Sequence, residues 1–373
     1  MKFNAITPND GYEYFFGYYD LQPYDKDGRY HLTHRVAFRD HHPSAEDIAE
    51  IGYIDLQTKT FVKVAETLAW NFQQGALLVW FESGKSVLFN DFDGEKYVAR
   101  VVDLSGNELK RFSRPFATVS PDRTKAISIN FSRIHDFRKG YGYSNLKDEY
   151  FDVNAPETDG IFLCNLTTGE SKLLASYADM AKMFAEPPFT DGKLVLNHIN
   201  FNPSGTGFVF LLRNFPAQGS KWGTLLGAGV LSGKLWKLTN FEVNSHYSFK
   251  DDDTLLIYSG LPEWGVYVIN VQNGSRSRLN NREVDKDDIH VNYSPDRSFF
   301  IGDGYVDKEQ KRWIYRYDFA TKEAYPLFSV YSEPVNDIDI RCDLHARFSP
   351  SGEKISYDTT QNNRREIIEV IWE

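Results

Sequence analysis

The sequence is poor in cysteine and has no long apolar runs. Only Cys164 and Cys342 are present among 373 residues, in unrelated contexts, which argues against a disulfide framework or a thiolate metal cluster. No apolar run approaches the ~18 residues of a membrane-spanning helix. The N-terminal stretch MKFNAITPND lacks the apolar segment of a secretory signal. We therefore expect a cytoplasmic protein without a membrane span.

Positive charge is also scarce. The chain has 42 Lys and Arg against 52 Asp and Glu, for a formal net charge of -10. This disfavours a nucleic-acid partner, because phosphate backbones bind basic surfaces. An anionic ligand therefore requires a local positive patch. Aromatic residues, in contrast, make up 15% of the chain, with 28 Phe and 22 Tyr, and these types favour strands over helices.

A short frame recurs in the second half of the chain. Each copy has a His, an aromatic residue three positions later, and then Pro or Asp opening a turn, as in LHARFSPSG (344–352). The frame histidines, spaced by roughly 50 residues, are His198, His246, His290 and His345. A period in this range indicates a repeat architecture. Copies without His near 21, 77 and 116 extend the repeat to seven units.

The units have the strand content of propeller blades. A β-rich run follows each turn, and most units add a strand pair around a polar turn, such as RVVDLSGNELKRF. Seven such blades close into a ring without free sheet edges. We predict an all-β fold, a single seven-bladed β-propeller domain over residues 1–373. Its last strand (366–372) is expected to pair with an N-terminal strand.

One connection is too long for a link between blades. Residues 132–160 are rich in Gly, Tyr and charge, and we expect a long functional loop on one face of the ring. Residues 176–186 are predicted to contain the only convincing helical turns. Residues 40–49 are interpreted as a smaller loop with one helical turn.

The common register of the frame histidines suggests a shared function. Equivalent positions in the blades of a propeller lie on one circle around its axis, so the four imidazoles are expected to face one pocket. Clustered imidazoles suit a metal site, an acid–base site, or both. A buried His that bonds within its own blade is the structural alternative, and the absence of His from the first three units disfavours it.

Other polar residues could complete this pocket. Arg213 ends the strand after the His198 turn, and Arg341 and Asp343 precede His345. For the two arginines a surface ion pair is an equally good interpretation, and for loop tyrosines simple packing is slightly better. Further candidates, at the entry of the second unit and on the long loop, are Gln73, Gln74, His135, Arg138, Tyr141 and Tyr143.

Several of these motifs resemble known propeller families. LHARFSPSG, IHVNYSPDRSFFIGDG and SHYSFKDDDTLLIY resemble the oligogalacturonate lyases, which are seven-bladed propellers. YFFGYYDLQPYDKDGRY, WNFQQGALLVW and RKGYGY are similar to the related ulvan-lyase-type propellers. The resemblance implies β-elimination of a uronate-containing glycan, with a His as base, an Arg that assists it, and a divalent metal on further histidines.

The resemblance also implies roles for individual residues. By motif, His246 matches the base and Arg213 the assisting arginine, while His290 and His345 match metal ligands. The family has a second His two positions before the last one, where this chain has Asp343. A carboxylate there shifts the expected metal from Zn toward Mn or Ca. The predicted site residues are catalytic His246, Arg213, His198 and Tyr143; substrate-binding Arg341, His135, Arg138 and Gln74; and metal-binding His290, His345 and Asp343.

The implied chemistry is consistent with this inventory. The proton at C5 of a uronate is very weakly acidic while the carboxylate is ionised, so a metal or Arg must neutralise that charge. A neutral His or Tyr can then remove the proton. We therefore predict a lyase for an anionic saccharide. Two alternatives stay open: a non-catalytic glycan-binding propeller in surface-polysaccharide assembly, and a protein-interaction scaffold without clustered histidines.

Overall fold

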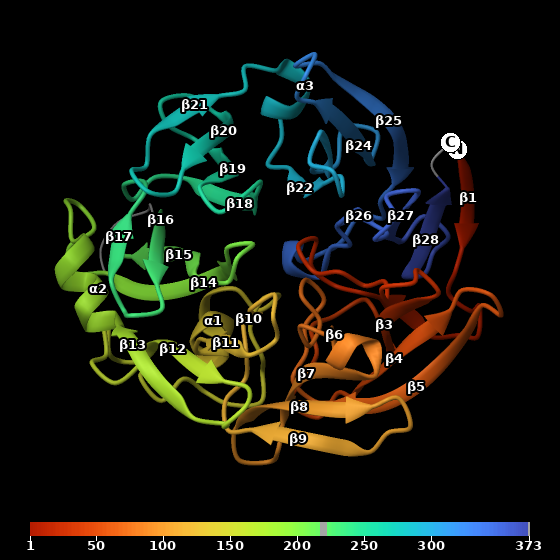
Figure 1. The fold of residues 1–373 in the computed structure, drawn as a ribbon, viewed down its shortest axis with the longest axis horizontal. Coiled ribbons are helices and arrows are strands. Elements are labelled where there is room, and N and C mark those ends of the chain that lie inside the picture. Colours follow the sequence, from red (N-terminus) through yellow and green to blue (C-terminus); the bar gives the residue numbers. More distant parts are fainter. Residues whose placement is uncertain (217–221, 372–373) are drawn as a thin grey trace. The chain divides into compact units, whose positions relative to one another are not determined.

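The structure is a computed structural model that describes residues 1–216 and 222–371. These residues form seven four-stranded antiparallel sheets (Figure 1). Seven consecutive sheets of this kind define an all-β, seven-bladed β-propeller, as predicted. The chain divides into two compact units, which are described separately. Unit 1 comprises Met1–Arg111, Arg138–Asn145 and Asn281–Glu373, and unit 2 comprises Phe112–Phe137 and Leu146–Asn280.

Unit 1 contains four of the sheets, in which each strand pairs antiparallel with its neighbour. They are β2 (Glu13–Phe15), β3 (Tyr30–Val36), β4 (Ala49–Asp55) and β5 (Thr60–Thr67); β6 (Val79–Phe81), β7 (Ser86–Phe92), β8 (Tyr97–Asp103) and β9 (Glu108–Phe112); β22 (His290–Tyr293), β23 (Phe299–Asp303), β24 (Lys311–Asp318) and β25 (Ala324–Tyr331); and β26 (Arg347–Phe348), β27 (Lys354–Thr359) and β28 (Glu366–Ile371) with β1 (Lys2–Ala5).

Unit 2 contains three sheets of the same kind. They are β10 (Thr118–Val119), β11 (Lys125–Ser128), β12 (Gly160–Asn165) and β13 (Ser171–Ser176); β14 (Lys193–Phe201), β15 (Gly207–Phe215), β16 (Gly223–Val230) and β17 (Leu235–Lys237); and β18 (Asn244–Phe249), β19 (Thr254–Ser259), β20 (Gly265–Asn270) and β21 (Arg276–Arg278).

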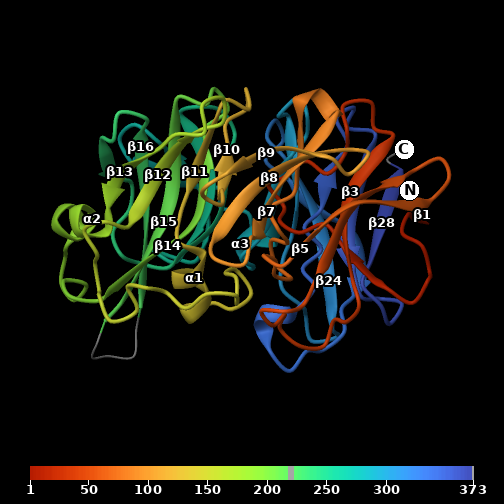
Figure 2. The same cartoon turned by 90° about the horizontal axis from the view of Figure 1, so that it is seen from below.

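One sheet joins the two ends of the chain. β1 pairs antiparallel with β28, from Lys2 opposite Ile371 to Ala5 opposite Ile368. Figures 1 and 2 both show β1 beside β28. The predicted pairing of the last strand with an N-terminal strand is therefore confirmed; Trp372, the predicted end of that strand, lies outside the described residues.

Burial falls from the first to the last strand of a sheet. β14 and β15 are buried along almost their whole length, which explains their nearly continuous apolar runs. β9, a fourth strand, is exposed except for Phe112. Side chains on first strands are therefore mostly buried. Three frame histidines lie on such strands, His198, His246 and His290, whereas His345 lies just before β26.

The turn between the first and second strands explains the repeated frame. Its last position has a left-handed backbone, with φ +71° at Gly205 and +78° at Gly352, a conformation that glycine adopts without strain. Arg297 takes the same place in another sheet, with φ +60°; there the Asp296 carboxylate accepts the N–H of Ser298 at 3.1 Å. The predicted copy at 21 is displaced, since it lies in the connection between β2 and β3.

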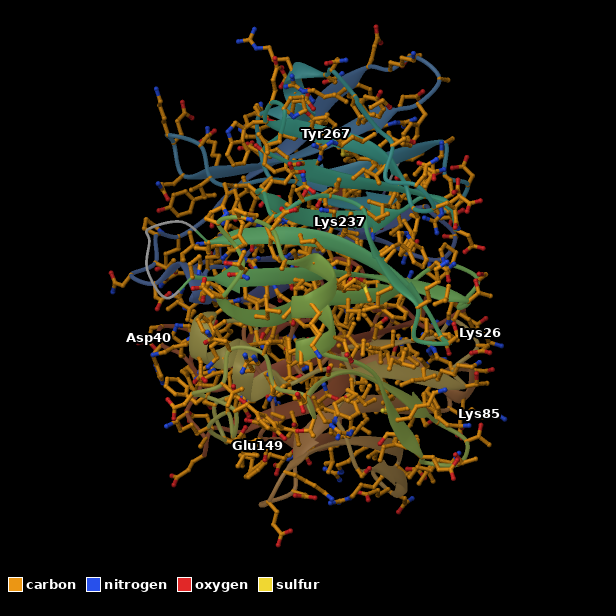
Figure 3. The ribbon with its side chains drawn as sticks, turned by 90° about the vertical axis from the view of Figure 1, so that its left-hand side faces the viewer. Lys26, Asp40, Lys85, Glu149, Lys237 and Tyr267 are labelled. Carbon is orange, nitrogen blue, oxygen red and sulfur yellow. The ribbon has the colours of Figure 1, made fainter. Side chains whose placement is uncertain are left out.

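Figure 3 shows the two ends of the sheets in unit 1. Lys26, in the β2–β3 connection, and Lys85, before β7, project from the same edge of the ribbon. Asp40, in the β3–β4 connection, projects from the opposite edge. Connections alternate between the two ends because neighbouring strands are antiparallel. The start of a first strand, such as His290 in β22, therefore lies at the end opposite the frame turns.

Helices are few, and the predicted one is present. α2 (Tyr177–Phe184) confirms the helical turns predicted in residues 176–186. Its capping box is complete: Ser176 Oγ accepts the N–H of Asp179 at 3.0 Å, and the Asp179 carboxylate accepts the N–H of Ser176 at 3.0 Å. Among the described residues, no helix is long and apolar enough to cross a membrane.

Replacing Ser176 by alanine is expected to lower the free energy of unfolding by about 1 kcal/mol, because the backbone N–H of Asp179 loses its acceptor. Urea unfolding followed by circular dichroism measures this change. Ser176→Asn is the matched control, since its side chain can still accept the capping hydrogen bond. Equal destabilisation by both variants would contradict a capping role.

Two helices and one loop differ from prediction. α1 (Phe131–Phe137) and α3 (Arg282–Asp285) are short enough to leave no clear sequence period. The segment 40–49 contains no helix; the N–H of Ser44 donates to the Asp47 carboxylate at 2.7 Å instead.

The long connection at 132–160 is divided between the two units. Its part 138–145 packs within unit 1, whereas α1 and residues 146–160 belong to unit 2. In unit 2 the fully buried Arg133 forms an ion pair with Asp148 at 2.9 Å. The same guanidinium donates to the carbonyl oxygens of Tyr150, Val153, Asn154 and Leu194. These bonds fix a stretch that has no strand of its own.

Candidate functional site

The first part of the site is the start of β22. His290 pairs in register with Asp303, the last residue of β23. His290 Nδ1 lies 3.3 Å from Asp303 Oδ2, and both side chains are buried. The same oxygen accepts the backbone N–H of Leu344 at 3.1 Å. One carboxylate thus orients His290 and fixes the chain just before His345.

The second part is His345, whose backbone has φ +45°. Left-handed backbone is uncommon outside glycine and often marks a functional position. His345 Nδ1 donates to the carbonyl oxygen of Gly17 at 2.7 Å. Nε2 therefore carries the lone pair, and it has no hydrogen-bond partner among residues 1–216 and 222–371. Burial, then the neighbouring His290 and the charge of Arg347, hold the pKa of His345 well below its ordinary value.

The Gly17 carbonyl is itself held in place. The buried Arg347 donates to the carbonyl oxygens of Gly17 and Tyr18, and Asp358 accepts the N–H of Gly17 at 3.3 Å. Gly17 has φ +126°, and a Cβ there would lie 2.9 Å from the carbonyl oxygen of Gln74. Only glycine fits this position, which explains the Gly in the run YFFGYYD.

The third part is Asp343, which lies between two guanidinium groups. Arg341 Nε is 2.9 Å from Oδ1 and Arg341 Nη2 is 2.7 Å from Oδ2. Arg312 Nη1 is 2.8 Å from Oδ1. Burial opposes ionisation of Asp343, but Arg341 and Arg312 outweigh it and hold the pKa of this carboxyl well below its usual range. Asp343 is therefore a buried, ionised carboxylate.

These three residues form one group. His290, Asp343 and His345 each offer a potential ligand atom, and the three atoms lie within 4.8 Å of one another. The two imidazole rings are 4.5 Å apart, and His345 Nε2 is 3.9 Å from Asp343 Oδ2. In both histidines Nδ1 faces an oxygen acceptor, as is common in metal-binding histidines. The predicted His/Asp group that could hold a metal ion is thus present in unit 1.

Further residues fix the irregular segment that carries Asp343. Gln73 Nε2 donates to the carbonyl oxygens of Asp339 and Arg341, at 3.2 and 3.0 Å. The guanidinium of Arg365 donates to the Arg341 carbonyl at 3.2 Å and stacks on Phe72. The sequence places Gln73 among the pocket candidates, but its amide N–H group holds the backbone of Asp339 and Arg341 instead.

Four tyrosines surround the group. The ring of Tyr19 lies 5.1 Å from that of His290, and the ring of Tyr18 lies 5.2 Å from that of His345. Tyr141 accepts a hydrogen bond from Arg341 at 3.3 Å. Tyr305 lies under the guanidinium of Arg341 at 5.4 Å, and burial raises its pKa. These rings shield the buried charges from water.

Three other predicted site residues belong to unit 1. Arg138 forms an ion pair with Asp339 at 2.9 Å and stacks on Tyr141. Gln74 is buried, and its N–H donates to Asn71. Tyr143 is fully buried, its hydroxyl accepts from Asn90 at 3.0 Å, and burial raises its pKa. The structure thus brings Arg138 close to the Arg341 segment, whereas the catalytic role of Tyr143 stays a prediction.

The remaining predicted residues belong to unit 2. His198 occupies a bulge in β14 with φ +41°, and its ring stacks on Tyr247 at 4.3 Å. His246 lies at a register shift in β18. Arg213, in β15, stacks on the half-exposed Trp222 at 4.7 Å. His135 lies on α1. The four frame histidines are therefore divided, two in each unit.

Some residues of the group escaped the sequence analysis. Asp303 could have been found, because counting outward from the β22–β23 turn places it opposite His290. Tyr18 and Tyr19 lie in YFFGYYD, a run that supported only the resemblance. Arg312 gave no signal, since it lies on β24 and reaches Asp343 only through the tertiary structure.

Comparisons with known proteins support the fold. Neither protein-family models nor curated proteins match this chain. An oligogalacturonate lyase in complex with manganese is similar over 100% of this chain and 93% of its own, with TM-score 0.67 and 14% identity. The oligogalacturonate lyase of Vibrio parahaemolyticus is similar over 99% and 93%, with the same TM-score and identity. A prolyl endopeptidase matches 98% of this chain but 49% of its own, with TM-score 0.56 and 10% identity.

These similarities define the class of protein. The chain is a seven-bladed β-propeller, and the predicted resemblance to the oligogalacturonate lyases is confirmed at the level of the fold.

Proposed function

We propose that this protein is a lyase that cleaves a uronate-containing oligo- or polysaccharide by β-elimination. The observation that carries the proposal is the buried group of His290, Asp343 and His345, in a chain whose whole length matches the fold of an oligogalacturonate lyase in complex with manganese. A fold alone does not define a function, so the chemistry of this group must support it.

The donor atoms of the group fit a divalent metal. Two imidazoles and one carboxylate are a nitrogen and oxygen set that suits manganese or zinc. Calcium prefers oxygen ligands, so a group with two imidazole nitrogens fits it less well. The buried Nε2 of His345 supports this assignment, because it faces the group with a free lone pair. We propose His290, His345 and Asp343 as the ligands.

The residues of the chain have separate tasks in this proposal. His290, Asp343 and His345 would hold a divalent metal, which would supply positive charge to offset that of the uronate carboxylate. Burial keeps His345 neutral, as a ligand must be. In unit 2, His246 is proposed to accept the C5 proton and Arg213 to stabilise developing charge. His198 and Tyr143 remain proposed catalytic residues.

The proposed ligand is an anionic saccharide, and the protein as a whole is acidic. Unit 1 gathers three guanidinium groups near Tyr141 and Tyr305, those of Arg138, Arg312 and Arg341, and guanidinium groups are suitable donors to a sugar carboxylate. We propose that Arg341, Arg138, Gln74 and His135 contact the substrate, and that the protein acts on oligosaccharides inside the cell.

The test is direct. The protein is incubated with Mn²⁺ and a panel of uronate oligosaccharides, and the ultraviolet absorbance of the unsaturated uronate product is followed. Absorbance that rises with one substrate class and not with neutral oligosaccharides supports the proposal. No product with any member of the panel contradicts it.

Replacing His345 by alanine is expected to remove bound metal, because one of two nitrogen ligands is lost. The affinity for Mn²⁺ should fall by more than the about 10- to 100-fold that outer-shell changes produce. Electron paramagnetic resonance of free Mn²⁺ measures this without turnover. His41→Ala is the matched control, since His41 is an exposed histidine of the same unit. Unchanged affinity in His345→Ala contradicts the ligand assignment.

One observation favours a second candidate, a non-catalytic glycan-binding propeller. Asp343 already has three short contacts with guanidinium groups, and these compete with a metal. Binding of uronate oligosaccharides without product, and without bound Mn²⁺, would establish this alternative.

A further inference from the structure

We propose that Arg312 and Arg341 make cation binding at His290, Asp343 and His345 depend on a carboxylate that binds with the cation. This inference rests on the proposed metal site and concerns how its occupancy is controlled. It comes from the two guanidinium groups on Asp343.

The first step is the state of the Asp343 oxygens. Oδ1 accepts a hydrogen bond from Arg341 Nε at 2.9 Å and lies 2.8 Å from Arg312 Nη1. Oδ2 lies 2.7 Å from Arg341 Nη2, but it accepts no hydrogen bond from the residues that the structure describes. Oδ2 also lies 3.9 Å from His345 Nε2. Asp343 can therefore contribute one oxygen to a cation while it keeps its contacts with both arginines.

The second step is the charge of the cluster. The guanidinium groups of Arg312 and Arg341 lie beside two carboxyl groups, those of Asp343 and Asp303. All four residues are at most 4% exposed. The buried guanidinium of Arg365, which donates to the Arg341 carbonyl, is a third cation in this cluster. The carboxyl groups therefore do not outnumber the guanidinium groups, and the cluster has no excess negative charge before any ligand binds.

The third step is the consequence for a divalent cation. Its two positive charges would be added to a buried environment that has no excess negative charge, where uncompensated charge is strongly unfavourable. The guanidinium groups that contact Asp343 repel the cation further. A carboxylate that enters with the cation removes part of this excess, which a neutral sugar cannot do.

The fourth step is the reciprocity of the two affinities. If a carboxylate tightens cation binding by some factor, the cation must tighten carboxylate binding by the same factor. Couplings of this type are typically about 5- to 150-fold. In such a site the uronate and the cation bind as a pair, and each is held weakly alone.

The experiment measures Mn²⁺ binding to the full chain by electron paramagnetic resonance, without turnover. The titration is done alone, with saturating galacturonate, and with saturating galactose. Galacturonate is a monosaccharide without a glycosidic bond to cleave, so the lyase reaction plays no part. We expect galacturonate to tighten Mn²⁺ binding at least about fivefold and galactose to leave it unchanged.

A variant tests the role of the arginine. Arg312→Met removes one positive charge and keeps much of the side-chain length, so Mn²⁺ should bind more tightly without a carboxylate, and the effect of galacturonate should shrink. Arg316→Met is the matched control, because Arg316 lies on the same strand and pairs with Asp318. Should Arg312→Met fail to fold, the comparison of galacturonate with galactose in the wild-type protein still decides whether Mn²⁺ binding depends on a carboxylate.

The outcomes separate this inference from the proposed function. Mn²⁺ affinity that is equal in all three titrations, or no Mn²⁺ binding in any of them, overturns the inference. Lyase product formed without Mn²⁺ leaves the function standing and also overturns the inference. Coupled binding with no lyase product supports the inference and contradicts the function.

Discussion

Acidification from pH 7 to pH 5 is expected to lower the unfolding free energy by about 4 kcal/mol, because two buried histidines must stay neutral in the folded protein. His31 and His34 lie on β3, and both are fully buried. Burial, and then the charge of Arg347, lower the pKa of His31 to about 3. Burial lowers the pKa of His34 to about 4.

The sign follows from the two protonation equilibria. In the unfolded chain both histidines take up a proton near pH 6.5, whereas in the folded protein they do so only far below it. The unfolded state therefore binds more protons between these values, and stability falls as the pH drops through 6.5. At pH 5 each histidine contributes a loss of about 2 kcal/mol.

The contacts of the two rings explain the low pKa values. His34 Nε2 accepts the backbone N–H of Ala76 at 3.0 Å, so a proton at this atom breaks the bond. His31 donates through Nδ1 to the Leu32 carbonyl at 2.8 Å, and its Nε2 faces Ser356 Oγ at 2.9 Å. Neither ring has room for a second donor without rearrangement of its partner.

Urea unfolding at the two pH values measures the effect, with the fluorescence of Trp70 and Trp80 as probe, since both lie in the same hydrophobic core as β3. His34→Gln keeps an acceptor for Ala76 and should halve the pH dependence. His41→Gln, at an exposed position, should leave it unchanged. A wild-type protein equally stable at pH 5 and pH 7 would refute the argument.

Much of the fold could be predicted because its repeated frame is a local signal. The turn after each first strand needs a left-handed residue, so Gly, or Asp followed by Arg, recurs there. Strand pairing then follows by counting outward from the turn, which also places Asp303 opposite His290 and the last strand beside the N-terminus. The displaced copy near 21 shows the limit of this signal, because β2 is separated from its turn by the Gly17 segment.

Less of the site could be predicted, because its partners come from distant parts of the sequence. The spacing of His290, Asp343 and His345 gave the potential ligands. The acceptor for His345, the Gly17 carbonyl, lies 328 residues away in the sequence. Arg312 reaches Asp343 from a third strand, and no local pattern marks a residue whose role depends on a tertiary contact.

Replacing His246 by alanine is expected to lower turnover of a verified uronate substrate by about 10²- to 10⁴-fold, the usual contribution of a general base. Several contacts in unit 2 support the choice of His246 as the base. His246 lies at a register shift in β18, and such irregularities often aim side chains in active sites. The next residue, Tyr247, donates to the carbonyl oxygens of His198 and Val209, at 3.0 and 3.2 Å.

These bonds tie the backbone beside His246 to the bulge that carries His198. The strained φ of His198 and the stacking of its ring on Tyr247 show that this part of unit 2 is tightly specified. Arg213 extends from the strand paired with that bulge and lies beneath Trp222. An imidazole, a guanidinium and an exposed aromatic ring are suitable for a sugar acid, because Trp can cover the apolar face of a sugar ring.

The kinetic pattern distinguishes a base from a structural histidine. If His246 removes the C5 proton, His246→Ala should reduce kcat with little change in KM, and free imidazole should restore part of the rate. Arg213→Ala should reduce kcat/KM through lost charge stabilisation, and imidazole should have no effect on it. His41→Ala is the control for loss of an exposed imidazole. Wild-type kcat in His246→Ala, or a loss that imidazole does not reverse and that follows the thermal stability of the variant, would remove His246 from the reaction and leave it a structural residue of β18.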